Sequence, residues 1–287
     1  MNKYLVDRLA TACFWAAAAV ITGILLYFLG YIFWRGAPVL TADFVLGMPR
    51  EMAAGGGVGP QLFNTFYVLA LSLLFSLPVG VGAGIYLAEY ARQGPLTNLI
   101  RLSTECLASV PSIVLGLFGA VVFVWYLGLG FCILAGAAAL ALLNLPVLVR
   151  VTEEALRAIP DSYREASLAL GATKWQTVRR VVLPGALPGM VTGVSLVAGR
   201  ALGESAILIY TAGLSVSRYF PDPDPFAAGE TLAVHLWYVN AQSLVPDATR
   251  IADGSAALLV LVVLVFNLCI GIPGRILQRR LLGGGGR

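Results

Sequence analysis

Long apolar runs alternate with short polar stretches along this chain of 287 residues. A helix needs about 20 consecutive apolar residues to cross the roughly 30 Å hydrocarbon core of a bilayer. Each run reaches that length, or twice that length in one case, so each is expected to form membrane-spanning helices. Glycines mark turns, and the double run is therefore divided near Gly128 and Gly130. The six expected spans cover residues 9–34, 62–88, the two halves of 106–149, 185–212 and 254–273.

The composition agrees with an all-α integral membrane protein of six transmembrane helices. Hydrophobic residues make up 59% of the chain and charged residues 12%, and the mean hydropathy is +0.84. A soluble domain could not keep that much apolar surface out of water. The first run continues well past the length of a signal peptide, so we interpret it as a retained anchor and the whole chain as mature protein.

The basic residues predict the orientation, because short cytoplasmic loops carry an excess of Lys and Arg. An even number of spans places both termini on one side, and that side holds fourteen of the nineteen Lys and Arg, against four on the other. Arg200 lies inside a span and belongs to neither side. We expect both termini and the polar stretch of residues 160–184 in the cytoplasm. The net charge of +4 then reflects topology, and no binding of nucleic acid is expected.

The polar stretch of residues 160–184 is expected to form two short helices, which we call the elbow. Ser162 with Glu165, and Thr173 with Gln176, each make the S/T-x-x-E/Q pattern of a capping box. Such a box satisfies free N–H groups at the start of a helix. The elbow is therefore expected to be rigid.

Gly171 and Pro184 are expected to end the two elbow helices. Glycine takes the left-handed conformation just past a helix end without steric cost. Proline has no backbone N–H, so it cannot donate the hydrogen bond that would continue a helix. The apolar side chains of the elbow cannot all face the bundle, so a stripe of them is expected to dock in a groove of a cytosolic partner. That stripe comprises Tyr163, Ala166, Leu170, Trp175, Val178 and Val182.

Local features are expected to shape the spans and loops. Pro111 interrupts the first turns of the third span and should kink it. Residues 35–60 are rich in glycine and are expected to form a flexible outer loop, whereas residues 231–241 predict a helix at the membrane interface. Small residues in the second span favour close packing against a neighbouring helix, namely Gly80, Gly82 and Gly84.

Arg200 and Glu204 lie four residues apart in the fifth span, on one face of a continuous helix. Each charge costs about 2.5 to 3.5 kcal/mol at a bilayer centre on insertion scales. In one interpretation the two side chains satisfy each other and stiffen the helix. In the other, Arg200 faces the permeation path and binds an anion transiently, and Glu204 holds its side chain between passages. The planar guanidinium suits phosphate oxygens better than an ammonium does.

The elbow also carries a pattern of fixed spacing, formed by Glu165, Ala166, Ser167, Gly171, Val181, Leu183 and Pro184. This pattern resembles the EAA motif of the permease subunits of ABC importers, with Ser167 in place of Ala and Val181 in place of Ile. In that family the elbow is a coupling helix, which docks in a groove of the ATP-hydrolysing subunit and passes its closure to the spans. The resemblance implies that the docking residues are Tyr163, Glu165, Ala166, Ser167, Leu170, Gly171, Ala172, Trp175, Leu183 and Pro184.

Three further stretches are similar to the permeases of phosphate importers, in the PstA branch: residues 86–90, 110–116 and 199–205. The resemblance extends from about residue 61 to residue 273. The departure is Ser205, where the family usually has threonine. This resemblance implies a type I ABC importer permease fold in the bacterial cytoplasmic membrane.

The same resemblance implies a domain organisation and a set of partners. An anchor helix and outer loop would occupy residues 1–60, the permease domain 61–274, and a basic, glycine-rich cytoplasmic tail 275–287. The expected partners are a second permease subunit (PstC-like), a dimer of ATP-binding subunits (PstB-like) and an external phosphate-binding protein (PstS-like). Inorganic phosphate would be the cargo, and ATP and Mg²⁺ would be bound by the ATPase, with no cofactor in this chain.

Several functions are disfavoured by motifs that the sequence lacks. It has no GxxxxGK[ST] loop to bind ATP, so the energy must come from a partner, and it has no HExxH or GxSxG motif of an enzyme. The four cysteines lack metal-ligand spacing and His235 is the only histidine, so no metal site is expected. The alternatives left open are the sister phosphate permease (PstC-like), a permease for another oxyanion and a secondary transporter, which would need inverted repeats.

Overall fold

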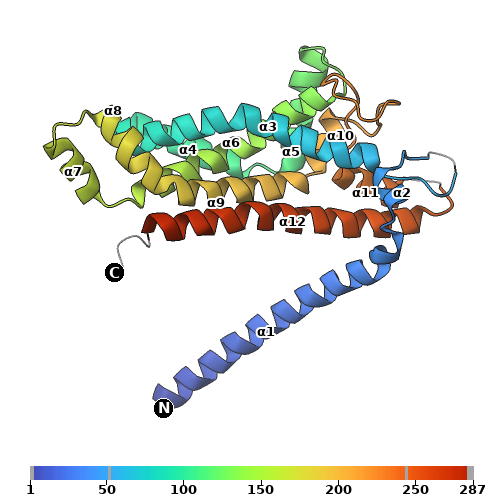
Figure 1. The fold of residues 1–287 in the computed structure, drawn as a ribbon, viewed down its shortest axis with the longest axis horizontal. Helices are drawn as coiled ribbons and strands as arrows, with labels where there is room; N and C mark the ends of the chain where they lie inside the picture. The colour runs from blue at the N-terminus through green and yellow to red at the C-terminus, as the bar shows by residue number, and fades with distance from the viewer. Residues whose placement is uncertain (1–2, 51–52, 243–244, 283–287) are drawn as a thin grey trace.

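The computed structural model describes residues 3–50, 53–242 and 245–282. These residues are almost entirely helical, and their β-structure is limited to an isolated bridge between Val216 and Gly229. The longer helices other than α1 lie side by side in an elongated bundle, with α7 and α8 at one end and α2 and α11 at the other (Figure 1). We call these the elbow end and the loop end. The α-helices are α1 (Lys3–Gly36), α2 (Ala42–Leu46), α3 (Gly59–Ile85), α4 (Pro95–Ser109), α5 (Ser112–Gly119), α6 (Ile133–Arg157), α7 (Asp161–Ala169), α8 (Lys174–Thr177), α9 (Leu183–Leu202), α10 (Ala206–Thr211), α11 (Leu232–Ala241) and α12 (Ala248–Leu282).

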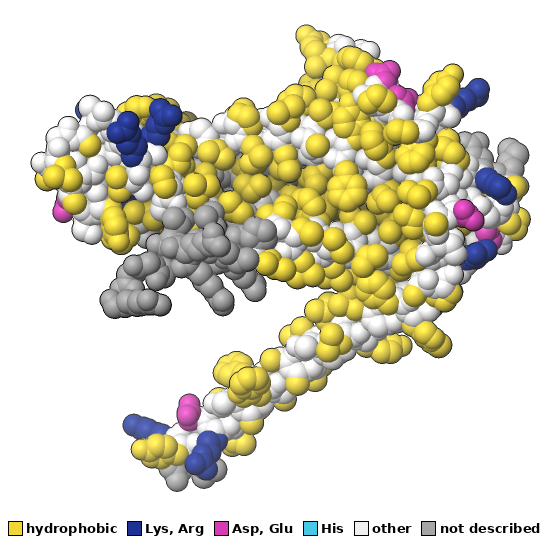
Figure 2. Space-filling model, in the orientation of Figure 1, with side chains coloured by type: hydrophobic (Ala, Val, Ile, Leu, Met, Phe, Trp, Pro, Cys, Tyr) yellow, Lys and Arg dark blue, Asp and Glu magenta, His cyan; other side chains and the backbone are white. Residues whose placement is uncertain are grey.

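Within the described ranges, five helical segments are long and apolar enough to cross a membrane. A sixth crossing results if α4 and α5, which are bent by 98° at a short break, form one span. The expected first, second, fourth and sixth spans are confirmed as α1, α3, α6 and α12. Hydrophobic side chains cover the flank of the bundle and charged ones gather at its ends (Figure 2), as a bilayer requires.

The third expected span is broken and not merely kinked. α4 ends at Ser109, and Val110 and Pro111 are extended, with ψ angles of 129° and 139°. Proline disfavours the helical conformation of the residue before it, which explains the break at Val110. Beyond it, α5 continues into a wider π-helical turn, η3 (Ala120–Tyr126).

The fifth expected span also differs from the prediction at both ends. Helix runs without a break from Lys174 to Leu202, so Pro184 does not end the second elbow helix. A π-helical turn, η4 (Val178–Val182), precedes the proline, and the N–H of Leu183 bonds to the carbonyl of Val178. Since π turns use longer-range bonds, this turn accommodates the N–H that Pro184 lacks. The span then stops at Leu202, and α10 begins only at Ala206.

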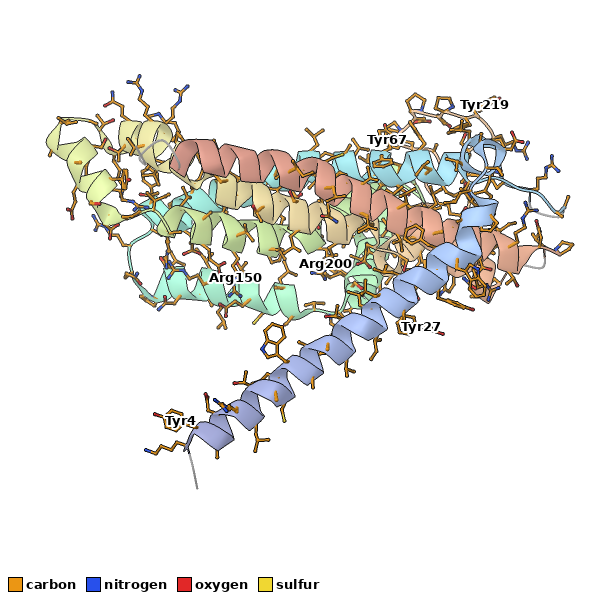
Figure 3. All side chains as sticks on the ribbon, turned by 60° about the horizontal axis from the view of Figure 1, so that its bottom comes forward. Tyr4, Tyr27, Tyr67, Arg150, Arg200 and Tyr219 are labelled. Carbon is orange, nitrogen blue, oxygen red and sulfur yellow. The ribbon has the colours of Figure 1, made fainter. Side chains whose placement is uncertain are left out.

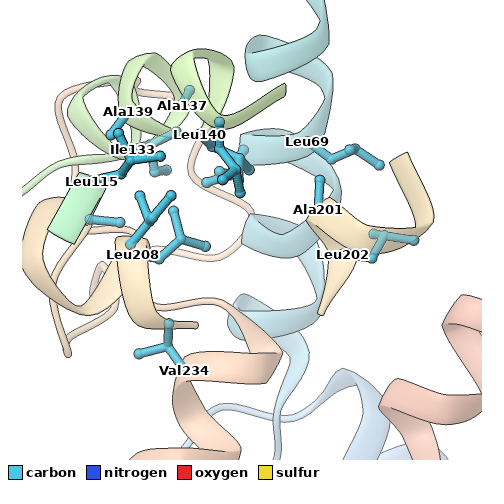
Figure 4. Close-up of a cluster of buried hydrophobic side chains, with 14 of the residues drawn as sticks. Leu69, Leu115, Ile133, Ala137, Ala139, Leu140, Ala201, Leu202, Leu208 and Val234 are labelled. Atoms are coloured by element: carbon cyan, nitrogen blue, oxygen red, sulfur yellow. The ribbon is translucent and has the colours of Figure 1, made fainter. Parts of the chain in front are cut away.

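α3 and α6 form the most extensive helix pair of the bundle. Two glycines on α3 permit their close approach: a Cβ at position 80 would lie 2.7 Å from the Leu148 Cβ, and one at position 84 would lie 2.5 Å from the Thr152 Cβ. The packing role expected of Gly80, Gly82 and Gly84 is therefore confirmed at positions 80 and 84 but not at 82, where a Cβ would meet nothing within 4 Å. Next to this pair lies the main hydrophobic core, which α3, α5, α6, α9, α10 and α11 supply with side chains that include Leu69, Leu115, Leu140, Leu202, Leu208 and Val234 (Figure 4).

The glycine-rich outer loop is folded, contrary to the expectation of a flexible approach. It contains a 3-10 turn, η1 (Ala37–Val39), and α2, whose start is capped by Thr41. The N–H groups of Val58 and Gly59 bond to the carbonyls of Phe44 and Gly47. These backbone bonds, together with the burial of Phe44 and Val58, fix the loop against the bundle. The helix expected over residues 231–241 is confirmed as α11, and its place at the membrane interface stays a prediction.

α1 contacts the bundle near its C-terminal end and then diverges from it (Figure 1). Arg35 at that end forms an ion pair of 2.8 Å with Asp253 of α12. None of the residues in the most apolar 18-residue window of α1 is buried within this chain. A helix that is hydrophobic all round requires lipid or another subunit as its surroundings.

Gly84→Ala is expected to destabilise the bundle, because the added Cβ would lie 2.5 Å from Thr152, and overpacking typically costs about 1–3 kcal/mol. Gly82→Ala is the matched control, since a Cβ at position 82 meets nothing within 4 Å and alanine favours helix over glycine. Thermal unfolding in detergent should show a lower Tm for Gly84→Ala only. Equal melting temperatures of the two variants would contradict the close α3–α6 contact.

Candidate functional site

The elbow consists of α7 and α8, joined by a turn at Gly171. The φ of Gly171 is +83°, the left-handed conformation expected for it. Its N–H bonds to the carbonyl of Leu168, and the N–H of Ala172 bonds to that of Ser167. These bonds satisfy carbonyls at the end of α7, so the chain reverses direction in a tight, defined turn.

One of the two expected capping boxes is present. Thr173 Oγ1 accepts from the N–H of Gln176 at 3.3 Å, and Gln176 Oε1 accepts from the N–H of Thr173 at 2.8 Å. The box expected from Ser162 is absent, because α7 begins two residues earlier than that box requires, with Pro160 as its N-cap and no side-chain cap. Ser162 therefore lies inside the first turn, and Glu165 is exposed.

Arg164 attaches α7 to the rest of the bundle. Its Nε and Nη2 donate to Glu89 Oε1 at 3.1 and 2.7 Å. Nη2 also donates to the carbonyl of Leu156 at 2.8 Å, and Nη1 to that of Ile159 at 2.7 Å and to Asp161 Oδ1 at 3.2 Å. All three nitrogens of the guanidinium thus have acceptors, which come from the end of α3, the end of α6 and the start of α7.

Two weaker contacts close the elbow on itself and on the bundle. The hydroxyls of Ser167 in α7 and Thr177 in α8 are 2.9 Å apart. The Lys174 ammonium lies 5.0 Å from the centre of the Tyr90 ring, within the range of a cation–π interaction. Beside these contacts is an open cavity of about 540 Å³, lined in part by Glu89, Arg164 and Lys174.

The outer surface of the elbow exposes large apolar side chains. Tyr163 and Trp175 are each 59% exposed and Leu170 is 90% exposed. Ala166 is exposed as well, whereas Ala172, Leu183 and Pro184 are partly buried. Val178 and Val182 were expected on the same stripe, but they are 1% and 0% exposed, because η4 turns them into the bundle. The exposed side chains of Tyr163, Ala166, Leu170 and Trp175 thus form an apolar surface at the elbow end of the bundle.

Arg200 and Glu204 are not on one face of a continuous helix. Arg200 lies in the last turn of α9, which ends at Leu202, and Glu204 lies in the link to α10. Neither side chain forms an ion pair or side-chain hydrogen bond with any residue that the structure describes. Arg200 is exposed midway along the bundle, while Arg150 lies nearer the elbow end (Figure 3).

A buried polar cluster at the loop end has no counterpart in the sequence analysis. Gln61 Nε2 donates to Glu230 Oε2 at 2.9 Å, and His235 Nδ1 lies 3.3 Å from Glu230 Oε1. The three residues are at most 7% exposed. The lone histidine lies in α11 and is therefore part of a contact among α3, Glu230 in the segment before α11, and α11 itself. The described residues hold no metal-binding group of three or more acidic, His or Cys side chains.

Comparison with known sequences identifies relatives over most of the chain. Residues 80–283 match the family model described as binding-protein-dependent transport system inner membrane component. A probable ABC transporter permease protein, YqgI of Bacillus subtilis, is 45% identical over 98% of this chain and 99% of its own length. The phosphate transport system permease protein PstA is 35% identical in Haemophilus influenzae, over 82% of this chain and 81% of its own length. PstA of Mycobacterium leprae is 36% identical, over 83% and 76%.

Solved structures share the fold. An inward-facing structure of the MetNI methionine ABC transporter contains a chain that is 25% identical, with a TM-score of 0.60 over 75% of this chain and 95% of that one. A bacterial alginate ABC transporter has a TM-score of 0.65 at 16% identity, over 96% and 95% of the two chains, which shows the fold alone. The fold is that of a type I ABC importer permease, and the chain is a multi-pass protein of the inner membrane. It belongs to the family of binding-protein-dependent transport system inner membrane components, the permease subunits of ABC transporters.

Proposed function

We propose that this chain is the PstA-type permease subunit of an ATP-driven importer of inorganic phosphate. The observation that carries the proposal is Arg200, an exposed guanidinium without a carboxylate partner among the described residues. PstA relatives at about 35% identity support the choice of phosphate. The YqgI relative is described without a substrate, so another oxyanion is the alternative that transport assays must test.

Arg200 receives the anion in this proposal. An unpaired charge facing hydrocarbon is costly, so the flank that carries Arg200 faces a water-filled path and not lipid. A path between this chain and a second, PstC-like permease subunit meets that need, and the guanidinium fork matches two phosphate oxygens at once. Glu204 stands free of Arg200 in this conformation, and it holds the guanidinium in another conformation, in which no anion is present.

The elbow docks on the ATPase in this proposal. Tyr163, Leu170 and Trp175 form the apolar surface that enters a groove of the PstB-like subunit, and Gly171 fixes the angle between the two elbow helices. Both termini and the elbow then lie in the cytoplasm, as the excess of Lys and Arg on that side supports. A PstS-like protein delivers phosphate to the loop end, and the ATPase supplies ATP and Mg²⁺.

Arg200→Lys is expected to assemble normally but to lose most phosphate uptake, because an ammonium lacks the bidentate geometry. The measurement is ATP-dependent uptake of labelled phosphate into vesicles that contain the complete complex with its binding protein. Arg150→Lys is the control, since Arg150 is exposed and already paired with Glu154 at 2.8 Å. Wild-type uptake by Arg200→Lys would refute the role of Arg200. Uptake driven by an ion gradient without ATP would refute the importer itself.

Gly171→Val is expected to insert into the membrane but to uncouple ATP hydrolysis from transport. The φ of +83° is unfavourable for a β-branched residue, although a Cβ there meets no neighbour within 4 Å. The cost therefore falls on the elbow turn alone. ATP hydrolysis and phosphate uptake are measured on the same vesicles, with Gly128→Val, at a left-handed glycine outside the elbow, as the control. Unchanged phosphate uptake per ATP in Gly171→Val would contradict a coupling role of the turn.

A further inference from the structure

We propose that the ion pair between Arg164 and Glu89 transmits movement of the elbow to α3, which makes both of them positioning residues of the transport cycle. The inference rests on the proposed function in one respect, that a partner ATPase moves the elbow. It assigns a specific side-chain contact to the transmission of elbow movement to α3, a helix to which the elbow has no direct covalent connection.

The pair is a well-built contact within the bundle. The side chains of Arg164 and Glu89 are 18% and 6% exposed, and their closest atoms are 2.7 Å apart. Two guanidinium nitrogens donate to the same carboxylate, and the remaining hydrogens of the guanidinium point to the carbonyls of Leu156 and Ile159 and to Asp161. Removal of either partner leaves a largely buried charge without compensation, which is strongly unfavourable.

The covalent connections of the elbow reach two helices of the bundle and bypass α3. α7 follows α6 after a short link, and α8 continues through η4 into α9. α7 itself packs mainly against α8 and η4. Within the described part of the chain, the polar and cation–π contacts from the elbow to the end of α3 are Arg164 with Glu89 and Lys174 with Tyr90. The second contact is exposed and weaker, so Arg164 provides the firm attachment.

Glu89 holds α3 at a position from which movement spreads. It lies in η2 (Tyr86–Tyr90), a π-helical turn that extends α3 to its end at Tyr90. Gly84 and Gly80, about one and two turns further into α3, form the close contact with α6. A displacement of α7 therefore acts through Arg164 on both helices of the α3–α6 contact at its elbow end, since the same guanidinium binds the carbonyl of Leu156 in α6 and that of Ile159 just beyond it.

The test compares Glu89→Gln with Glu154→Gln in the complex with its ATPase. Both substitutions remove the carboxylate of an Arg–Glu ion pair, but the Arg150–Glu154 pair is local and exposed. Glu89→Gln is expected to assemble and hydrolyse ATP, while phosphate uptake per ATP falls about tenfold, a size typical of coupling between sites. Glu154→Gln should keep the wild-type ratio. A wild-type ratio in Glu89→Gln would overturn the proposal.

A second readout does not depend on the substrate. The exposed Cys13, Cys106 and Cys269 are first changed to serine. Leu74 of α3 and Leu196 of α9, which are 63% and 68% exposed, are then replaced by cysteines that carry spin labels. The distance between the labels should change on nucleotide binding in the otherwise wild-type complex and stay constant in Glu89→Gln. A nucleotide response that is equal in the two, or absent from both, would overturn the link. Absence of phosphate uptake by the wild type would refute the proposed substrate and leave this readout intact.

Arg164→Lys covers the case in which Glu89→Gln fails to assemble. Lysine keeps the charge, but its single ammonium cannot serve Glu89, Leu156 and Ile159 in the geometry of the guanidinium fork. The expected result is an assembled complex with reduced uptake per ATP and a smaller nucleotide-dependent change in label distance. Full coupling in both measurements would overturn the proposal.

Discussion

Burial of the Arg164 guanidinium among acceptors from three segments is the constraint on which the elbow end of this structure depends. A guanidinium has no way to lose its charge, so every hydrogen left without an acceptor in a buried place is costly. The carboxylate of Glu89, the carbonyls at the end of α6 and Asp161 must therefore converge on one point. Their convergence fixes where α3 and α6 end and where α7 begins, and it leaves the opposite surface of α7 exposed.

The middle of the bundle obeys a different constraint, the close approach of α3 and α6. Gly80 and Gly84 bring the α3 backbone against Leu148 and Thr152, at distances that a larger residue would prevent. Lipid tails are as apolar as the helices, so the hydrophobic effect does not drive two apolar helices together within a bilayer. Close packing at small residues favours their association instead. The two constraints act on the same helices. Because close-packed interfaces deform little, a contact this tight transmits a shift at one end of α3 along the whole helix.

Prediction from sequence succeeded where the signal is local and failed where it is not. Apolar run length identified four spans, and the Gly171 turn and the Thr173 capping box follow from a few adjacent residues. Wrong predictions at Pro111, at Pro184 and at the end of α9 arise where one or two residues decide between a kink, a π turn and a helix end. Hydropathy averaged over a run does not resolve that choice. The burial of Val178 and Val182 was missed for the same reason, since it depends on η4.

Contacts between distant segments had no signal in the single sequence. Glu89 and Arg164 are 75 residues apart, and Gln61 is 169 residues from Glu230. Each of these residues on its own resembles an ordinary polar residue at the end of a span. The sequence located the elbow, Arg200 and Glu204, but the partners that hold the elbow, and the separation of Arg200 from Glu204 by the end of α9, required the fold.

The π turn at Val178–Val182 has a consequence for the angular relation between the two ends of the helix from Lys174 to Leu202. Successive residues of an α-helix are rotated by about 100° around its axis. A π turn holds one residue more than the α turn it replaces, so it sets the direction in which every later side chain projects. Deletion of one residue between 178 and 182 would restore a regular α-helix at almost unchanged length. It would leave Arg200 projecting in almost its present direction relative to the elbow surface, whereas a regular α-helix with the same number of residues would rotate Arg200 by about 100°. The π turn thus sets the angle between Arg200 and the elbow surface as well as the distance between them.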